Sequence, residues 1–310
     1  MKYRVFLLFL ALCLYAVERG QAKEKYNLWA KERIRYLRTK VNLKPHDPHL
    51  RVLLANAYYE NKKSYDALEE LREALRMRPD FAEAHCNMGV ILHSQGRLPE
   101  ARKYYEEALQ KDSTLVEARA GLGALLCRTE QEAAGLRYLK QVLQEDPYRV
   151  SARFNMAVAY HKLGDFKQAI KHLEMVRQHK TTYPGVKPAL GRAYYSQGLK
   201  YLQAKQAEAA TRTLGQALGL LQYNANIHYA KGLGHMQLEE LEEAEEAFGA
   251  AVKLESDHVP ALHNLAVIYD RTGRMEEALS YYGKVQALAP HLHTIDAARH
   301  AHYDVKFLVE

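Results

Sequence analysis

Residues 82–115 read AEAHCNMGVILHSQGRLPEARKYYEEALQKDSTL, and the same pattern of small and large apolar residues returns along most of the chain. Apolar residues recur at the i, i+3, i+4 spacing of a buried helical stripe, with Met88 and Leu92 before a turn at Gly96 and Tyr105 after it. Two short amphipathic helices cannot cover both of their apolar faces alone. We therefore predict that this unit stacks on copies of itself.

Three positions of the unit recur at a period of 34 residues, interrupted once by a step of 41. The small position of the second helix gives Ala67, Ala101, Gly135, Ala169, Ala210, Ala244 and Ala278. The small position of the first helix gives Ala55, Gly89, Gly123, Ala157, Gly191, Gly232 and Ala266. The position that closes the second helix gives Pro79, Ser113, Pro147, Thr181, Gln222, Ser256 and Pro290. This self-similarity predicts an all-α array of helix-turn-helix repeats.

A helix-turn-helix of 34 residues with this small, aromatic and proline pattern resembles the tetratricopeptide repeat (TPR) family. The resemblance implies an α-α superhelix, or TPR solenoid, of seven repeats over residues 48–292. We expect the repeats at 48–81, 82–115, 116–149, 150–183, 184–224, 225–258 and 259–292, and a capping helix at 293–310. The family's tryptophan near the start of each repeat is absent, replaced by residues such as His85, Arg119 and Arg153, and Gly135 stands where alanine is commonest.

The fifth repeat carries the seven extra residues, and the spacing of Gly191 and Tyr194 recurs in Gly198 and Tyr201. Seven residues make nearly two helical turns, so we predict a first helix that projects about 10 Å beyond its neighbours. The extra length is interpreted either as a tolerated insertion or as a docking edge for a specific partner.

The N-terminal segment, residues 1–22, has the pattern of a secretory signal. Lys2 and Arg4 precede thirteen apolar or aromatic residues at 5–17, and small residues follow at 20–22. We expect cleavage after Ala22 and export, to the periplasm or outside the cell. The alternative is an uncleaved membrane anchor with cytoplasmic repeats, because a basic downstream flank favours the cytoplasm.

Positive charge is concentrated in residues 1–44, which hold 11 Lys and Arg against 3 Glu, so the rest of the chain is nearly neutral. The array therefore has no basic face for nucleic acid, and we exclude nucleic acid as a partner. The basic helix expected at 23–47 is interpreted as a solvated cap on the first repeat. The alternative is that its basic residues at 23–44 contact anionic lipid.

The sequence contains few residues that could form a disulfide, a metal site or a catalytic site. Cys86 and Cys127 lie in first helices of adjacent repeats and are expected to be reduced and packed, although a disulfide in an oxidising compartment is the alternative. The histidines at 291, 293, 300 and 302 lack a carboxylate set to complete a metal site. The chain has no phosphate loop or nucleophile elbow. We expect no cofactor, no metal and no catalysis.

First helices line the concave groove in the TPR family, and the resemblance carries fifteen positions of this chain into that groove. They are Asn56, Tyr59, Asn87, His93, Arg128, Phe154, Asn155, His161, Lys162, Arg192, Tyr195, Tyr229, His263, Asn264 and Arg271. Asparagine recurs at the sixth position of a repeat, where its amide can bond the backbone of an extended peptide. The aromatic residues add contact area, and the cations can meet carboxylates.

One specialisation of the family is testable from the sequence. Co-chaperones that grip a C-terminal carboxylate use Lys and Asn in one first helix, Asn in the next, and Lys and Arg in the third. Asn56 and Asn87 match, but Val52, Glu117 and Gly121 replace the three cations. The resemblance therefore implies a neutral or mixed ligand and not an acidic tail.

These observations predict a non-enzymatic scaffold that binds a peptide or helix of a protein partner in the groove during assembly of an envelope or membrane-associated complex. Two alternatives remain at this point. One is an accessory subunit that delivers substrates to a separate enzyme, such as a glycosyltransferase or a cytochrome maturation apparatus. The other is a self-assembling structural protein.

Overall fold

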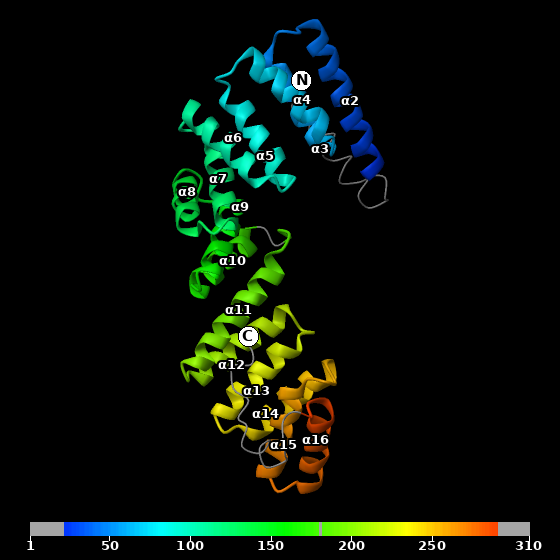
Figure 1. The fold of residues 1–310 in the computed structure, drawn as a ribbon, viewed down its shortest axis with the longest axis vertical. Helices are drawn as coiled ribbons and strands as arrows, with labels where there is room; N and C mark the ends of the chain where they lie inside the picture. Colours follow the sequence, from blue (N-terminus) through cyan, green and yellow to red (C-terminus); the bar gives the residue numbers. More distant parts are fainter. Residues whose placement is uncertain (1–21, 180–181, 291–310) are drawn as a thin grey trace. The chain divides into compact units, whose positions relative to one another are not determined.

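The computed structural model describes residues 22–179 and 182–290, with side chains from residue 28 onward (Figure 1). These residues form fifteen α-helices and no strand, which confirms the all-α fold. The expected signal or anchor segment, apart from Ala22, and the expected capping helix lie outside the described residues. The helices are α2 (Ala22–Leu43), α3 (Pro48–Glu60), α4 (Ser64–Met77), α5 (Ala82–Ser94), α6 (Leu98–Lys111), α7 (Val116–Arg128), α8 (Glu132–Glu145), α9 (Val150–Lys162), α10 (Phe166–His179), α11 (Val186–Gln203), α12 (Ala207–Leu220), α13 (Ala225–Gln237), α14 (Leu241–Leu254), α15 (Val259–Arg271) and α16 (Met275–Leu288).

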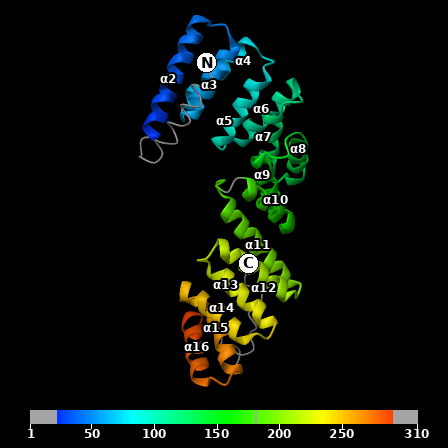
Figure 2. The same ribbon diagram turned by 180° about the vertical axis from the view of Figure 1, so that it is seen from behind.

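The helices fall into two compact units: unit 1 (Met1–Glu145) with α2 to α8, and unit 2 (Asp146–Glu310) with α9 to α16. In both units each repeat is one helix pair, from α3 with α4 to α15 with α16. In unit 1, α2 packs on α3 through a stripe of Ala30, Ile34, Leu37 and Val41, and both views show these helices side by side (Figures 1 and 2). Among the described residues, none of the helices combines the length and the apolar character needed to cross a bilayer.

The two helices of a repeat approach closely because a small residue of the first helix faces a large residue sixteen positions later. A Cβ atom added to Gly89 would lie 2.8 Å from the ring of Tyr105, and one added to Gly232 would lie 2.6 Å from the ring of Phe248. Such distances are far below van der Waals contact, so the small residue sets the separation of the two helices.

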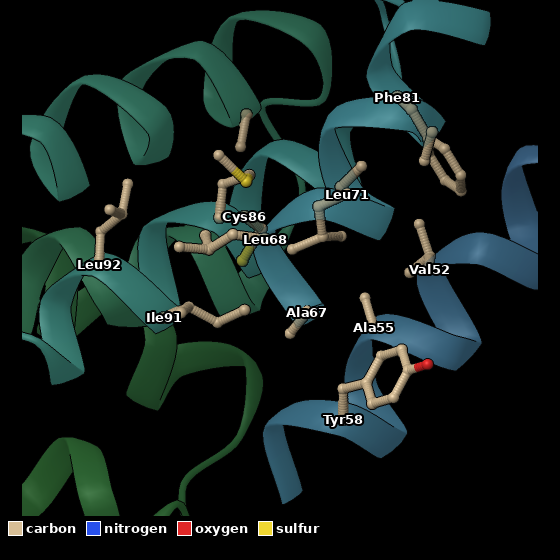
Figure 3. Packing of buried hydrophobic residues seen from close by; sticks show 14 of the residues in the cluster. Val52, Ala55, Tyr58, Ala67, Leu68, Leu71, Phe81, Cys86, Ile91 and Leu92 are labelled. Atoms are coloured by element: carbon tan, nitrogen blue, oxygen red, sulfur yellow. The ribbon is translucent and has the colours of Figure 1, made fainter. Parts of the chain in front are cut away.

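The core of unit 1 illustrates this packing at the first repeat (Figure 3). Ala55 of α3 and Ala67 of α4 lie at the helix crossing, and Tyr58 and Leu71 lie beside them. Both alanines are fully buried. Their recurrence in the sequence therefore reflects the crossing of two helices in every repeat.

The turn inside each repeat contains one residue in the left-handed region of backbone conformation. These residues are Lys62, Gly96, Glu130, Gly164, Lys205, Glu239 and Gly273, with φ between 56° and 78°. They follow the predicted period of 34 residues with one step of 41. Glycine adopts this conformation readily, whereas the lysines and glutamates carry a cost of roughly 1–2 kcal/mol.

The turns between repeats are held by the side chains that replace the family's tryptophan. His85 Nε2, Arg119 Nη2 and Arg153 Nε each donate a hydrogen bond to the backbone carbonyl six residues earlier, at 2.9, 3.0 and 3.0 Å. Arg51 and His228 make the same contact at 3.4 and 3.3 Å. The polar replacements therefore satisfy carbonyl groups two residues beyond the ends of the preceding helices.

The fifth repeat differs from the prediction in two respects. Its first helix, α11, has 18 residues where the other six first helices have 13, which lengthens it by about 7.5 Å. The predicted extension of two turns was therefore too long, because the other two extra residues lie in the connection before α11. A Cβ on Gly198 would lie 2.6 Å from Leu214, sixteen residues later, whereas Gly191 faces Leu221 beyond the end of α12. Gly198 thus occupies the small position, and its assignment to Gly191 was wrong.

Candidate functional site

The first helices form one layer of each unit. In unit 1, α3 contacts α5 and α5 contacts α7, and in unit 2, α9 contacts α11 and α11 contacts α13. Within each unit, consecutive second helices show no comparable contact in the described part of the chain. The first helices are therefore the more closely spaced layer, which is the layer that the TPR resemblance assigns to ligand binding.

A hollow of about 380 Å³ opens on this layer in unit 1; we call it the α3–α5–α7 hollow. It is lined by His49, Val52, Leu53, Asn56, Glu83, Cys86, Asn87, Leu115 and Glu117. The amide Nδ2 of Asn87 donates a hydrogen bond of 2.9 Å to Oδ1 of Asn56. Two of the predicted groove asparagines are thus joined across α3 and α5.

The α3–α5–α7 hollow has several apolar lining residues and an acidic rim. Leu53 is 45% exposed, so the lining presents some apolar surface to solvent. Glu83 and Glu117 are exposed carboxylates, and the lining contains no lysine or arginine. Arg78, which is not part of the lining, donates to Nε2 of the lining residue His49 at 3.0 Å.

Further along unit 1, the predicted groove residues His93 and Arg128 meet on α5 and α7. Nη1 of Arg128 lies 3.3 Å from Nε2 of His93, and the His93 ring lies edge-on to Tyr105. Burial and then the charge of Arg128 lower the pKa of His93. The imidazole is therefore neutral at pH 7 and accepts the hydrogen bond from Arg128. Tyr59 is half-buried against the core.

In unit 2, the predicted residues of α9 and α11 lie in different environments. His161 Nε2 lies 3.2 Å from Ser196 Oγ, and burial followed by the charge of Arg192 lowers the pKa of His161. The ring of Phe154 packs on Tyr183 at a centroid distance of 5.3 Å. Burial raises the pKa of Tyr195 to about 12. Asn155 is half-buried, whereas Lys162 and Arg192 are exposed.

Three predicted groove residues belong to the core of unit 2. Tyr229 and His263 are fully buried, and Asn264 is 6% exposed. Asn264 Nδ2 donates to Tyr229 Oη at 3.3 Å and to the Pro260 carbonyl at 3.1 Å. The prediction that these side chains face a ligand is therefore wrong. Arg271 is exposed and pairs with Glu239.

Leu53, Glu83 and Leu115 were missed as candidate site residues. A signal for the site was nevertheless present in the comparison with the carboxylate-gripping co-chaperones. Four of the five positions compared, Val52, Asn56, Asn87 and Glu117, line the α3–α5–α7 hollow, and Gly121 does not.

The remaining candidate chemistry is limited. Cys86 and Cys127 are buried, and no disulfide joins them in this structure. Within residues 22–179 and 182–290, no three His, Cys, Asp or Glu side chains gather where they could hold a metal ion. The C-terminal histidine cluster lies outside the described residues.

Comparison with known proteins gives matches to repeat proteins. Two family profiles, each described as tetratricopeptide repeat, match residues 52–115 and 229–293 and residues 130–193, together more than half of the chain. No curated protein sequence matches. Similar solved structures include YrrB, titled a TPR protein with an unusual peptide-binding site, at 18% identity over 74% of this chain and 96% of YrrB, with a TM-score of 0.41.

Two structures of MamA are also similar. MamA from Desulfovibrio magneticus RS-1 is 21% identical over 58% of this chain and 97% of its own, with a TM-score of 0.42. MamA from AMB-1 is 21% identical over 62% of this chain and 100% of its own, with a TM-score of 0.45. With seven helix pairs at the 34-residue period and family matches in both units, the chain belongs to the tetratricopeptide repeat family.

Proposed function

We propose that the chain is a non-enzymatic scaffold that binds an extended segment of a partner protein in the α3–α5–α7 hollow. The observation that carries this proposal is the hydrogen bond between Asn56 and Asn87 in a lining that also contains the exposed Leu53. Their hydrogen bond uses Oδ1 of Asn56 and one proton of Asn87. Nδ2 of Asn56 and Oδ1 of Asn87 can then bond the carbonyl and N–H groups of a peptide backbone.

The lining also indicates the chemistry of the bound segment. Leu53 and Leu115 suit an aliphatic side chain, since burying their exposed apolar surface favours binding. Glu83 and Glu117 stand on the rim and favour a lysine or arginine of the partner. The partner segment is therefore apolar with at least one basic residue, a narrower class than the neutral or mixed ligand expected from the sequence.

The carboxylate at Glu117 argues against an acidic terminal tail as the ligand. Co-chaperones of the family that grip a C-terminal carboxylate place a cation at this position and another at the position of Val52. A partner carboxylate near Glu117 would meet repulsion and lose its hydration without compensation. The charge of the rim thus supports a basic segment.

A displayed library of random peptides, selected on the full chain, tests this proposal. We expect enrichment of peptides that combine an aliphatic residue with Lys or Arg. A synthetic peptide of the selected sequence should bind the E83K/E117K variant at least about tenfold more weakly, because two favourable charges become repulsive. The matched control is E242K/E243K, which makes the same charge change at two exposed carboxylates of α14.

The control should keep the affinity of the wild type. Selection of acidic peptides, or an equal loss in the E242K/E243K variant, would contradict the proposed site. The single variant E83K provides the same comparison if circular dichroism shows that E83K/E117K has lost helicity.

We also propose that the scaffold acts after export, in assembly of an envelope or membrane-associated complex, on the basis of the signal-like residues 1–22. Intact mass of the native protein from soluble, membrane and exported fractions tests this. Loss of residues 1–22 in the exported fraction supports export. Full-length protein in the membrane, with repeats digested only from the cytoplasmic side, would contradict export and support an anchor.

A further inference from the structure

A second hollow, of about 800 Å³, lies between α2 and the turn that joins α3 to α4; we call it the basic hollow. One wall is α2, and the other is formed by Asn61 and Lys63 of the turn. The α2 wall consists of Lys31, Ile34, Arg35, Arg38, Thr39 and Asn42. The basic hollow shares no residue with the α3–α5–α7 hollow.

The packing of α2 fixes this arrangement. Its apolar stripe is buried on the first repeat, which sets the rotation of the helix about its axis. Lys31, Arg35 and Arg38 are spaced by four and three residues, so they project from one face one turn apart. The rotation of α2 brings that face opposite Lys63.

The basic hollow concentrates positive charge. Four cations line it, and no aspartate or glutamate does. On the adjoining face of α2, Arg33 is paired with Glu60, whereas Lys31, Arg35 and Lys63 form no ion pair with a described side chain. Like charges held this close repel one another, and a bound anion relieves that repulsion.

Arg38 has further neighbours at the back of the basic hollow. Burial raises the pKa of Tyr58, and the charge of Arg38 partly opposes this rise, which places the guanidinium near the phenol. The negative charges of Asp66 and Glu70 also raise the pKa of Tyr58, and Glu70 is paired with Arg51. Asp66 can offset part of the positive charge, but the lining itself holds four cations and no carboxylate, so an excess of positive charge remains.

We propose that the basic hollow binds a compact anion with two or more phosphate groups, either free in solution or as the headgroup of an anionic lipid. Arg35 and Arg38 stand one turn apart, with Cβ atoms about 5–6 Å from each other, so each guanidinium can hold a separate phosphate. Thr39 and Asn61 already donate to the backbone carbonyls of Arg35 and Ala57. Recognition therefore rests mainly on the four cations, which suits a phosphate-bearing ligand.

Binding of inorganic pyrophosphate to the full chain, measured by calorimetry, tests the free form of this ligand. Sedimentation with phosphatidylcholine vesicles, with and without cardiolipin, tests the lipid form, because the cardiolipin headgroup carries two phosphates. The test variant is R35Q/R38Q. The matched control is R137Q/K140Q, which removes two exposed cations at the same i, i+3 spacing from α8 of the same unit. Both variants keep residues 1–21, so any contribution of that apolar segment to vesicle binding is the same in the two proteins.

We expect saturable binding of pyrophosphate or of cardiolipin vesicles that is weakened about tenfold or more in R35Q/R38Q and is unchanged in the control. Binding of pyrophosphate alone assigns a free ligand. Cardiolipin-dependent sedimentation that pyrophosphate competes away assigns a lipid headgroup. Lys63→Gln, on the opposite wall, should weaken the same binding and provides the comparison if R35Q/R38Q does not fold.

Three results would overturn the proposal. One is the absence of binding to both phosphate probes. The second is an equal loss in R35Q/R38Q and in the control, which would indicate unspecific attraction to a basic protein. The third is binding of a polyglutamate peptide without binding of either phosphate probe, which would make the basic hollow a site for an acidic protein segment.

Discussion

The replacement of Gly135 by alanine tests the close approach of α7 and α8. A Cβ atom at this position would lie 2.5 Å from Sγ of Cys127, 2.7 Å from the carbonyl oxygen of Gly123 and 2.8 Å from the backbone nitrogen of Cys127. Two of these three neighbours are backbone atoms, so a change of rotamer cannot relieve the overlap. The helices must move apart, which disturbs the buried contacts of Leu139 and Val142.

The magnitude follows from two opposing effects. Overpacking of a tight core costs about 1–3 kcal/mol, whereas alanine gains about 0.5–1 kcal/mol over glycine inside a helix. We expect Gly135→Ala to lower the free energy of unfolding by about 1–2 kcal/mol. The family resemblance alone would suggest the opposite sign, because alanine is commonest at this position of the repeat.

The control is Gly249→Ala on α14, where an added Cβ would meet no atom within 4 Å. This variant should be more stable by about 0.5–1 kcal/mol, since only the helical preference of alanine changes. Hydrogen exchange of the α7, α8 and α14 amides reports each change locally, and urea denaturation reports the net effect. Unchanged or greater protection of α7 and α8 in Gly135→Ala would refute the close approach of these helices.

Three further predictions concern turns and caps. Glu130→Gly removes the backbone strain of a non-glycine residue at φ 59° and should raise the free energy of unfolding by about 0.5–1 kcal/mol in urea denaturation. A lower free energy of unfolding would contradict the turn geometry. Arg119→Ala removes a side chain that donates a hydrogen bond to the Ser113 carbonyl and pairs with Glu145. Thermal denaturation should show that the free energy of unfolding falls by about 1–3 kcal/mol, and an unchanged free energy would mean that this inter-repeat contact does not stabilise the fold. His258 Nδ1 accepts a hydrogen bond from the Ala261 N–H at the start of α15, and burial lowers the pKa of His258. The neutral His258 side chain therefore stabilises the fold fully above about pH 6.5, and this stabilisation declines as the pH falls from there toward the folded-state pKa. His258→Asn keeps a cap that does not titrate and should flatten the stability of α15 between pH 5 and about 6.5 in hydrogen exchange; an unchanged pH dependence would contradict the assigned role.

The architecture was predictable because each repeat needs a small residue at the helix crossing, and that requirement is visible as a period in the sequence. The fifth repeat was less predictable, since Gly191 and Gly198 both fit the pattern. Only the packing of Gly198 against Leu214 distinguishes them. The left-handed turns at Lys62 and Glu130 also had no local signal, because neither residue type favours positive φ.

The candidate site was predicted in part. Counting positions from the start of a repeat placed Asn56 and Asn87 on the ligand-facing layer, and the structure joins them. The same counting failed for Tyr229 and His263, both at the fifth position of a repeat, which packs against neighbouring helices in unit 2. Whether that position is exposed depends on the rotation and spacing of the helices, and the sequence period does not specify either.

The acidic, apolar α3–α5–α7 hollow is the proposed binding site, and a charge exchange across it is the most direct test. The affinities of a library-selected peptide and of its Lys→Glu version are measured on the wild-type chain and on the E83K/E117K variant. We predict that the wild type prefers the lysine peptide and that the variant prefers the glutamate peptide, with a coupling of at least about tenfold. The same preference in both proteins would contradict the site.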